Sequence, residues 1–142
     1  MEFCKHGTYS IRFDSNKVFV EATGPFNLEL VQDYKLKIEE CISALEPCPW
    51  GQIITLNELS LFTPEAESAL IFGLKLRKER GLKACAIVAK SPFRIVLQQI
   101  DKIYSEAEIK HKTFKNERDA VYWVDDEINN YKRLRHPFKY GS

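Results

Sequence analysis

The sequence lacks the residue patterns on which most enzymes and metal proteins depend. Its four cysteines include no CxxC pair, and neither they nor its three histidines stand at metal-ligand spacing. No phosphate loop precedes the central predicted helix, and no histidine or cysteine accompanies Glu58, Glu65 and Glu67 at a spacing typical of catalysis. We therefore expect a protein that is not an enzyme and that has no metal and no cofactor.

An excess of charge and long apolar runs are also missing. The 21 basic and 20 acidic residues leave a net charge of +1, whereas a nucleic-acid-binding protein normally carries a clear basic excess. No stretch approaches the roughly 20 apolar residues of a membrane span, and the first ten residues lack the apolar core of a signal peptide. We expect no nucleic-acid partner, no integral membrane segment and a reduced, cytoplasmic setting.

The cysteines are then expected to be ordinary core or surface residues. Cys41 and Cys85 fall on apolar faces of predicted elements, which favours burial. Cys48 lies in a loop between two prolines and is expected to be accessible.

The residues that are present have the composition of one globular domain. Hydrophobic residues make up 44% and charged residues 29% of a 142-residue chain, which is large enough to bury a core without disulfides or metals. We expect a domain over residues 1–134 and a flexible tail over residues 135–142.

Hydrophobic periodicity predicts five strands and four helices. The predicted strands cover residues 8–14, 18–23, 52–56, 82–89 and 109–114. The predicted helices cover residues 28–45 and 64–80, a segment that begins at Ser91 and Pro92, and a segment that follows Asn116 and frays from Lys132. Strands and helices that alternate after an initial hairpin predict an α/β fold of order ββαβαβαβα, with a single mixed, mostly parallel five-stranded sheet.

The helix over residues 64–80 has clear boundary signals. Thr63 is placed as its N-cap, Pro64 occupies the first helical position, and Gly81 closes it. Small and apolar residues at helical spacing predict its inward face, which consists of Ala66, Ala69, Leu70, Gly73 and Leu76. Basic residues around its end predict a solvated face, which consists of Lys75, Arg77, Lys78, Arg80 and Lys83.

Three segments carry a resemblance to a known family: VFVEATGPFNLE, WGQIITLNELSLFTPEAESAL and FKNERDAVYWVDDEI. Together with the order of the elements, they make nearly the whole chain similar to the STAS-like family, the fold of bacterial anti-sigma-factor antagonists of the SpoIIAA type. More narrowly, the chain resembles the bacterial SpoIIAA-like proteins that are grouped with Sec14-type lipid-binding folds.

The resemblance draws attention to the start of the second predicted helix. In the antagonists, a serine at this position is phosphorylated by a partner kinase, and the phosphate disrupts partner binding. In the matching stretch of this chain, residues 62–66, the only hydroxyl belongs to Thr63. Glu65 and Glu67 already place negative charge in the first turn, where they would repel a phosphate. We expect Thr63 to be a plain N-cap and the phospho-serine switch to be absent.

The candidate site lies at the carboxyl ends of the parallel strands, where ligands usually bind in open α/β sheets. Three phenylalanines near helix starts either line an apolar pocket there or form a patch used for association. Polar residues of the loop after the central strand either contact a partner or only form the turn. The candidate surface consists of Phe26, Asn57, Glu58, Ser60, Phe62, Thr63 and Phe93.

Two functions remain open from the sequence. The first is a non-enzymatic regulatory domain that binds a protein partner, with a homodimer through the uncovered aromatic surface near Phe26 and Phe62 as a further possibility. The alternative is a carrier of a small apolar ligand or lipid, which requires a cavity on the order of 300 Å³ or more.

Overall fold

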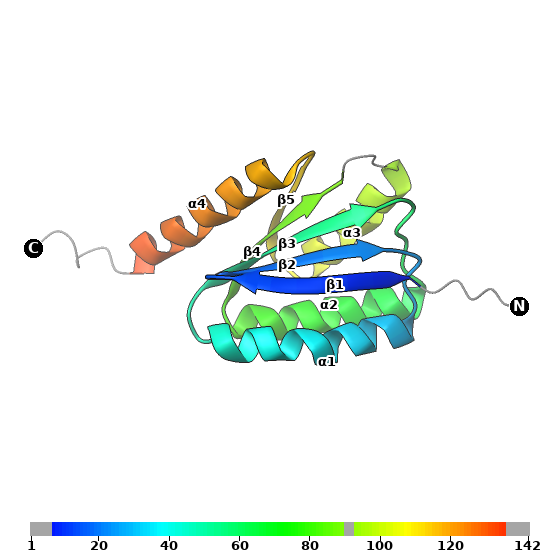
Figure 1. Cartoon of the computed structure of the whole chain (residues 1–142), viewed down its shortest axis with the longest axis horizontal. Coiled ribbons are helices and arrows are strands. Elements are labelled where there is room, and N and C mark those ends of the chain that lie inside the picture. The colour runs from blue at the N-terminus through cyan, green and yellow to red at the C-terminus, as the bar shows by residue number, and fades with distance from the viewer. Residues whose placement is uncertain (1–6, 90–92, 136–142) are drawn as a thin grey trace, which may run out of the picture.

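The computed structural model describes residues 7–89 and 93–135, and within these ranges it holds the predicted elements in the predicted order (Figure 1). The strands are β1 (Thr8–Asp14), β2 (Lys17–Thr23), β3 (Trp50–Asn57), β4 (Leu82–Val88) and β5 (Lys110–Phe114). The helices are α1 (Leu28–Leu45), α2 (Pro64–Glu79), α3 (Arg94–Glu106) and α4 (Glu117–Arg135).

The five strands form one mixed sheet in the order β1-β2-β3-β4-β5. β1 pairs antiparallel with β2, and the other three pairings are parallel. Because each strand adds to the same side of the previous one, crossovers of one hand leave their helices on one face of the sheet. Accordingly, α1, α2 and α3 contribute to one hydrophobic core, and α4 packs on the opposite face (Figure 1). The predicted fold class is confirmed.

The two cores differ in size because the sheet alternates its side chains between its two faces. Along β3, Trp50 and Ile54 point to the larger core under α1–α3, whereas Ile53 points to the smaller core under α4. The smaller core is completed by Ala120, Val124 and Ile128 of α4, all three of which are fully buried.

The inward face of α2 is rotated from the predicted one. Ala66, Leu70 and Gly73 are buried as expected, but Leu76 is 38% exposed and Arg77 is only 4% exposed. At about 100° per residue, Arg77 lies about 20° from Ala66 on the helix surface, whereas Leu76 lies about 80° away. Arg77 therefore stands in the middle of the apolar stripe. The prediction of a solvated Arg77 was wrong because it followed residue type rather than helical angle.

The observed start of α4 agrees with the prediction, but its end does not. Asn116 caps α4 as predicted, since its side-chain oxygen accepts a hydrogen bond from the Asp119 N–H at 2.9 Å. The helix then continues to Arg135, so the predicted fraying from Lys132 was wrong. The predicted start of α3 at Ser91 and Pro92 lies outside the described residues, as do residues 136–142.

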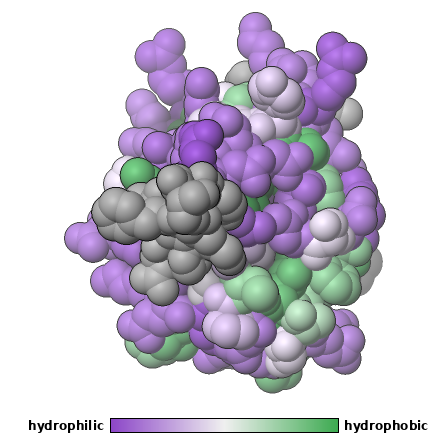
Figure 2. Space-filling model, turned by 90° about the vertical axis from the view of Figure 1, so that its left-hand side faces the viewer, coloured by the Kyte–Doolittle hydropathy of each residue, from purple (hydrophilic) through white to green (hydrophobic). Residues whose placement is uncertain are grey.

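The face at the end of α4, on the left of Figure 1, is mostly hydrophilic, and hydrophobic side chains gather low on it, on the side of α1 and α2 (Figure 2). None of the helices within residues 7–89 and 93–135 combines the length and the apolar character needed to cross a membrane.

Two glycine-to-alanine variants test the packing of the two faces. A Cβ atom at Gly51 would lie 2.2 Å from Val124 Cγ1, so we expect Gly51→Ala to push α4 from the sheet and to lower the free energy of unfolding by about 1–3 kcal/mol. A Cβ atom at Gly73 would meet nothing nearer than 3.6 Å, and alanine favours a helix interior, so Gly73→Ala should be neutral or stabilising by up to about 1 kcal/mol. Urea denaturation measures both, and equal midpoints for Gly51→Ala and the wild type would contradict the packing.

Candidate functional site

Two strand-to-helix loops are joined at the carboxyl edge of the sheet. The Phe26 N–H donates to the Leu61 carbonyl at 2.8 Å, and the Thr63 N–H donates to the Phe26 carbonyl at 3.0 Å. The rings of Phe26 and Phe62 lie side by side, with centroids 4.6 Å apart. These two candidate residues therefore approach each other as predicted, but Phe26 is only 4% exposed and belongs to the core.

Ser60 strengthens the same junction from within. Its side chain is fully buried, and its hydroxyl accepts a hydrogen bond from the Gly24 N–H at 3.0 Å while donating to the Asn57 carbonyl. A Cβ atom at Gly24 would lie 2.6 Å from Ser60 Cα, so glycine is needed for the loops to approach this closely. Ser60 thus connects the two loops and does not face a partner.

The other polar candidates have different positions. Asn57 donates to Glu21 Oε2 and to Thr23 Oγ1, both at 3.2 Å, and so joins the ends of β2 and β3. Glu58 is exposed at the tip of the loop, with a left-handed backbone at φ 55°. Of the polar residues that the sequence singled out in this loop, Glu58 faces solvent most directly.

Thr63 is an N-cap. Its Oγ1 accepts a hydrogen bond from the Ala66 N–H at 3.2 Å, and Glu65 and Glu67 lie in the first turn of α2, as the sequence predicted.

Gln99 of α3 is a residue of this site that the sequence analysis missed. Its Oε1 accepts from the Phe62 N–H at 2.9 Å, and its Nε2 donates to the Phe62 carbonyl at 3.0 Å. The amide thereby pairs with Phe62 as a neighbouring strand would. No local pattern reveals this role, because the pairing spans 37 residues of sequence.

Apolar side chains surround this junction on its outer side. Leu61, Phe62 and Ile95 line an open groove of about 420 Å³ between the starts of α2 and α3. Leu59, Phe93 and Ile95 are 47%, 47% and 55% exposed. We call Leu59, Leu61, Phe62, Phe93 and Ile95 the carboxyl-edge patch. Phe93 belongs to this patch and is not part of the ring pair of Phe26 and Phe62.

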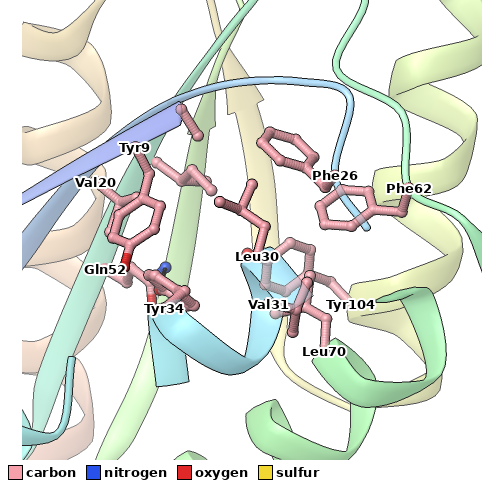
Figure 3. Close-up of a pocket in the computed structure, with 12 residues that line it drawn as sticks. Tyr9, Val20, Phe26, Leu30, Val31, Tyr34, Gln52, Phe62, Leu70 and Tyr104 are labelled. Atoms are coloured by element: carbon pink, nitrogen blue, oxygen red, sulfur yellow. Dashed lines mark hydrogen bonds between the residues drawn. The ribbon is translucent and has the colours of Figure 1, made fainter. Parts of the chain in front are cut away.

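A small apolar cavity lies behind the junction, between the sheet and helices α1 and α2 (Figure 3). Phe26 and Phe62 stand at one side of it, Tyr9 and Tyr34 at the other, and Leu30 between them (Figure 3). Its volume is about 40 Å³, enough for a few water molecules and far below the roughly 300 Å³ that a carrier needs.

A few polar side chains lie among the apolar ones that line this cavity. The Gln52 side-chain amide donates to the Tyr34 hydroxyl at 3.1 Å, and its Oε1 is buried without a partner. Burial raises the pKa of Tyr34 and Tyr104, and burial together with the hydrogen bond to Asp33 raises the pKa of Tyr9. All three phenols therefore stay protonated at neutral pH and act only as hydrogen-bonding groups.

Cys85 and Cys48 follow the sequence prediction, whereas Cys41 is less buried than predicted. Cys85 is fully buried, and burial raises its pKa to about 12; Cys48 is exposed, and Cys41 is half-buried. Within the described ranges, no group of three histidine, cysteine or acidic residues stands close enough to hold a metal ion.

Comparison with known proteins finds no matching family model and no matching curated protein. Among solved structures, the chain matches the crystal structure of an uncharacterised DUF3478-family protein from Shewanella loihica PV-4, described as having a SpoIIAA-like fold. The match has a TM-score of 0.63 and covers 87% of this chain and 98% of that chain, at 16% identity. The chain has a SpoIIAA-like fold. The resemblance drawn from the sequence is thus confirmed for the fold. A match at 16% identity shows the fold alone.

Within this SpoIIAA-like domain, Thr63 variants test the N-cap. Thr63→Ala should lower the free energy of unfolding by about 1 kcal/mol because one N–H of the first turn loses its acceptor, whereas Thr63→Ser and Thr63→Asp should cost little. Thermal and urea unfolding of the three variants measure this. Phosphothreonine at position 63 in protein from its native cells would show instead that the hydroxyl is a modification site.

Proposed function

We propose that this SpoIIAA-like domain is a non-enzymatic binding domain that contacts a protein partner through the carboxyl-edge patch. The observation that carries the proposal is the groove that Leu61, Phe62 and Ile95 line. Exposed Leu59 stands two residues before Leu61, and exposed Phe93 stands two residues before Ile95. Contiguous exposed apolar side chains are typical of interaction surfaces.

The frame behind the patch supports a binding role. Gln99 fixes the Phe62 backbone, and Glu67 of α2 forms an ion pair with Lys102 of α3 at 3.0 Å on the rim of the groove. A surface held in place before binding loses less conformational entropy when a partner docks. An apolar segment of a partner, flanked by polar side chains that meet this rim, matches the chemistry of the groove.

A ligand carrier is the second candidate, and the cavity behind Phe26 and Phe62 favours it. Its walls are almost entirely apolar, but its volume of about 40 Å³ admits a lipid chain only if the walls move apart. The four hydrogen bonds to the backbone of Phe26, Phe62 and Thr63 oppose a separation of the two loops that form one side of it.

A homodimer through the aromatic pair has less support than the sequence suggested. Phe26 is buried within one chain, so it supplies no free surface for a two-fold contact. A second copy that docks on the carboxyl-edge patch remains one form that the proposed protein partner can take.

Aspartate substitution in the patch tests the proposal. Ile95→Asp should reduce capture of the partner by at least about tenfold, because it places a charge at the centre of an apolar contact. The measurement is quantitative mass spectrometry of crosslinked complexes from native cells, with sedimentation of the purified protein to detect self-association. Leu36→Asp is the matched control, since Leu36 is 74% exposed on α1, away from the patch.

Equal capture by the wild type and Ile95→Asp, with Leu36→Asp unchanged, would refute binding at this surface. Loss of capture by both variants would place the contact elsewhere and count equally against it.

A further inference from the structure

Arg77 presents a charge without a counter-charge. It is 4% exposed in the middle of the buried stripe of α2, and its Nε and Nη2 atoms are buried and donate no hydrogen bond. None of the ion pairs formed among residues 7–89 and 93–135 includes Arg77. A guanidinium stays protonated even when buried, so it cannot avoid the cost of burial by losing its proton.

The neighbours of Arg77 do not neutralise it. Its Cζ atom lies 5.4 Å from the centroid of the Tyr34 ring, a cation–π contact that offsets only part of the lost hydration. Arg77 lowers the pKa of Tyr34 and of Cys85, but burial outweighs this effect and both groups remain uncharged at neutral pH.

The two unpaired donors belong to one edge of the guanidinium. Nε and Nη2 point in parallel and match the two oxygens of a single carboxylate. Arg80, one turn further along the chain, uses this same edge for the Glu46 carboxylate, with Nε and Nη2 at 2.8 and 2.9 Å from its oxygens. In Arg77 the equivalent edge is free within the described part of the chain.

Arg77 also lines a groove of about 200 Å³ between α1 and α2. Its rim carries Lys35 and Gln32, which add a positive charge and an amide, and none of the described residues that line it is acidic. Its remaining walls are mainly apolar. Val31, Tyr34 and Leu70 line both this groove and the cavity behind Phe26, so the two spaces share a wall.

We propose that the groove between α1 and α2 binds a small organic acid whose carboxylate pairs with the Nε and Nη2 edge of Arg77 and whose apolar body lies along Ala69, Leu70 and Phe72. Lys35 strengthens the attraction from the rim. Lys35 and Phe72 are both exposed, and rotation of such side chains opens the way to the guanidinium. This site is independent of the carboxyl-edge patch and of the proposed protein partner.

Titration with sodium octanoate tests the proposal. 1-Octanol is the probe that keeps the apolar chain without the charge, and sodium acetate is the probe that keeps the carboxylate without the long chain. Calorimetry and thermal shift at constant ionic strength should show that octanoate binds the wild type at least about tenfold more tightly than either probe. Arg77→Met should remove this preference while the protein stays folded, because methionine fills a similar volume without charge. Arg80→Met is the matched control and should bind octanoate as the wild type does, since Arg80 already has its carboxylates.

Several results would overturn the site. These are no octanoate binding to the wild type, equal affinity for octanol and octanoate, inorganic phosphate binding as tightly as octanoate, or unchanged octanoate affinity in Arg77→Met. If Arg77→Met does not fold, the Nε–H resonance of Arg77 in the wild type decides the matter. It should shift and exchange more slowly with water upon octanoate addition, and an unmoved resonance at saturating octanoate refutes the contact.

Discussion

The hydrogen bonds that join residues 24–26 to residues 60–63 determine the geometry of the carboxyl edge. Parallel strands β2 and β3 end side by side, and each must turn into a helix on the same face of the sheet. The backbone bonds between Phe26, Leu61 and Thr63 continue the strand pairing into these loops, and the Ser60 hydroxyl satisfies the Gly24 N–H at the closest approach. Because buried backbone groups must find partners, this junction fixes where α1 and α2 begin and therefore how they meet.

Gln99 extends the same constraint to the third helix. Its amide pairs with both backbone groups of Phe62, so α3 is positioned against the loop by a side chain that substitutes for a strand. The consequence is an edge on which apolar side chains from two elements are displayed on a fixed frame. A loop that satisfied its own backbone groups would leave Leu59, Leu61 and Ile95 without a defined arrangement.

Beside the larger core, below this edge, the buried charge of Arg77 lowers the stability of the fold. Hydrophobic residues pack around Tyr34, Gln52 and Arg77, and three of the polar atoms of this group have no hydrogen-bond partner. An uncompensated buried charge typically costs several kcal/mol, which is a large part of the stability of a domain of this size. This cluster lies beside two spaces that share a wall, one apolar and one with a positive rim, and this position supports a ligand role. The smaller core under α4 is a cluster of buried hydrophobic residues.

Local sequence determined the elements of this protein and their ends. Apolar periodicity gave the strands and helices, Thr63 and Pro64 marked the start of α2, Gly81 its end, and Asn116 the start of α4, because caps and turns depend on residues within one turn of the chain. The order of these elements was also sufficient for the fold class, and together with three carrying segments it gave the SpoIIAA-like resemblance. Tertiary structure decided which candidate residues face solvent. Ser60 and Phe26 are buried by contacts across more than thirty residues, Phe93 is separated from the phenylalanine pair, and Gln99 acts at long range. Arg77 depends on both levels. Its helical angle, which the sequence contains, places it on the apolar stripe of α2, but only the packing of that stripe in the fold shows that a charged side chain is buried there.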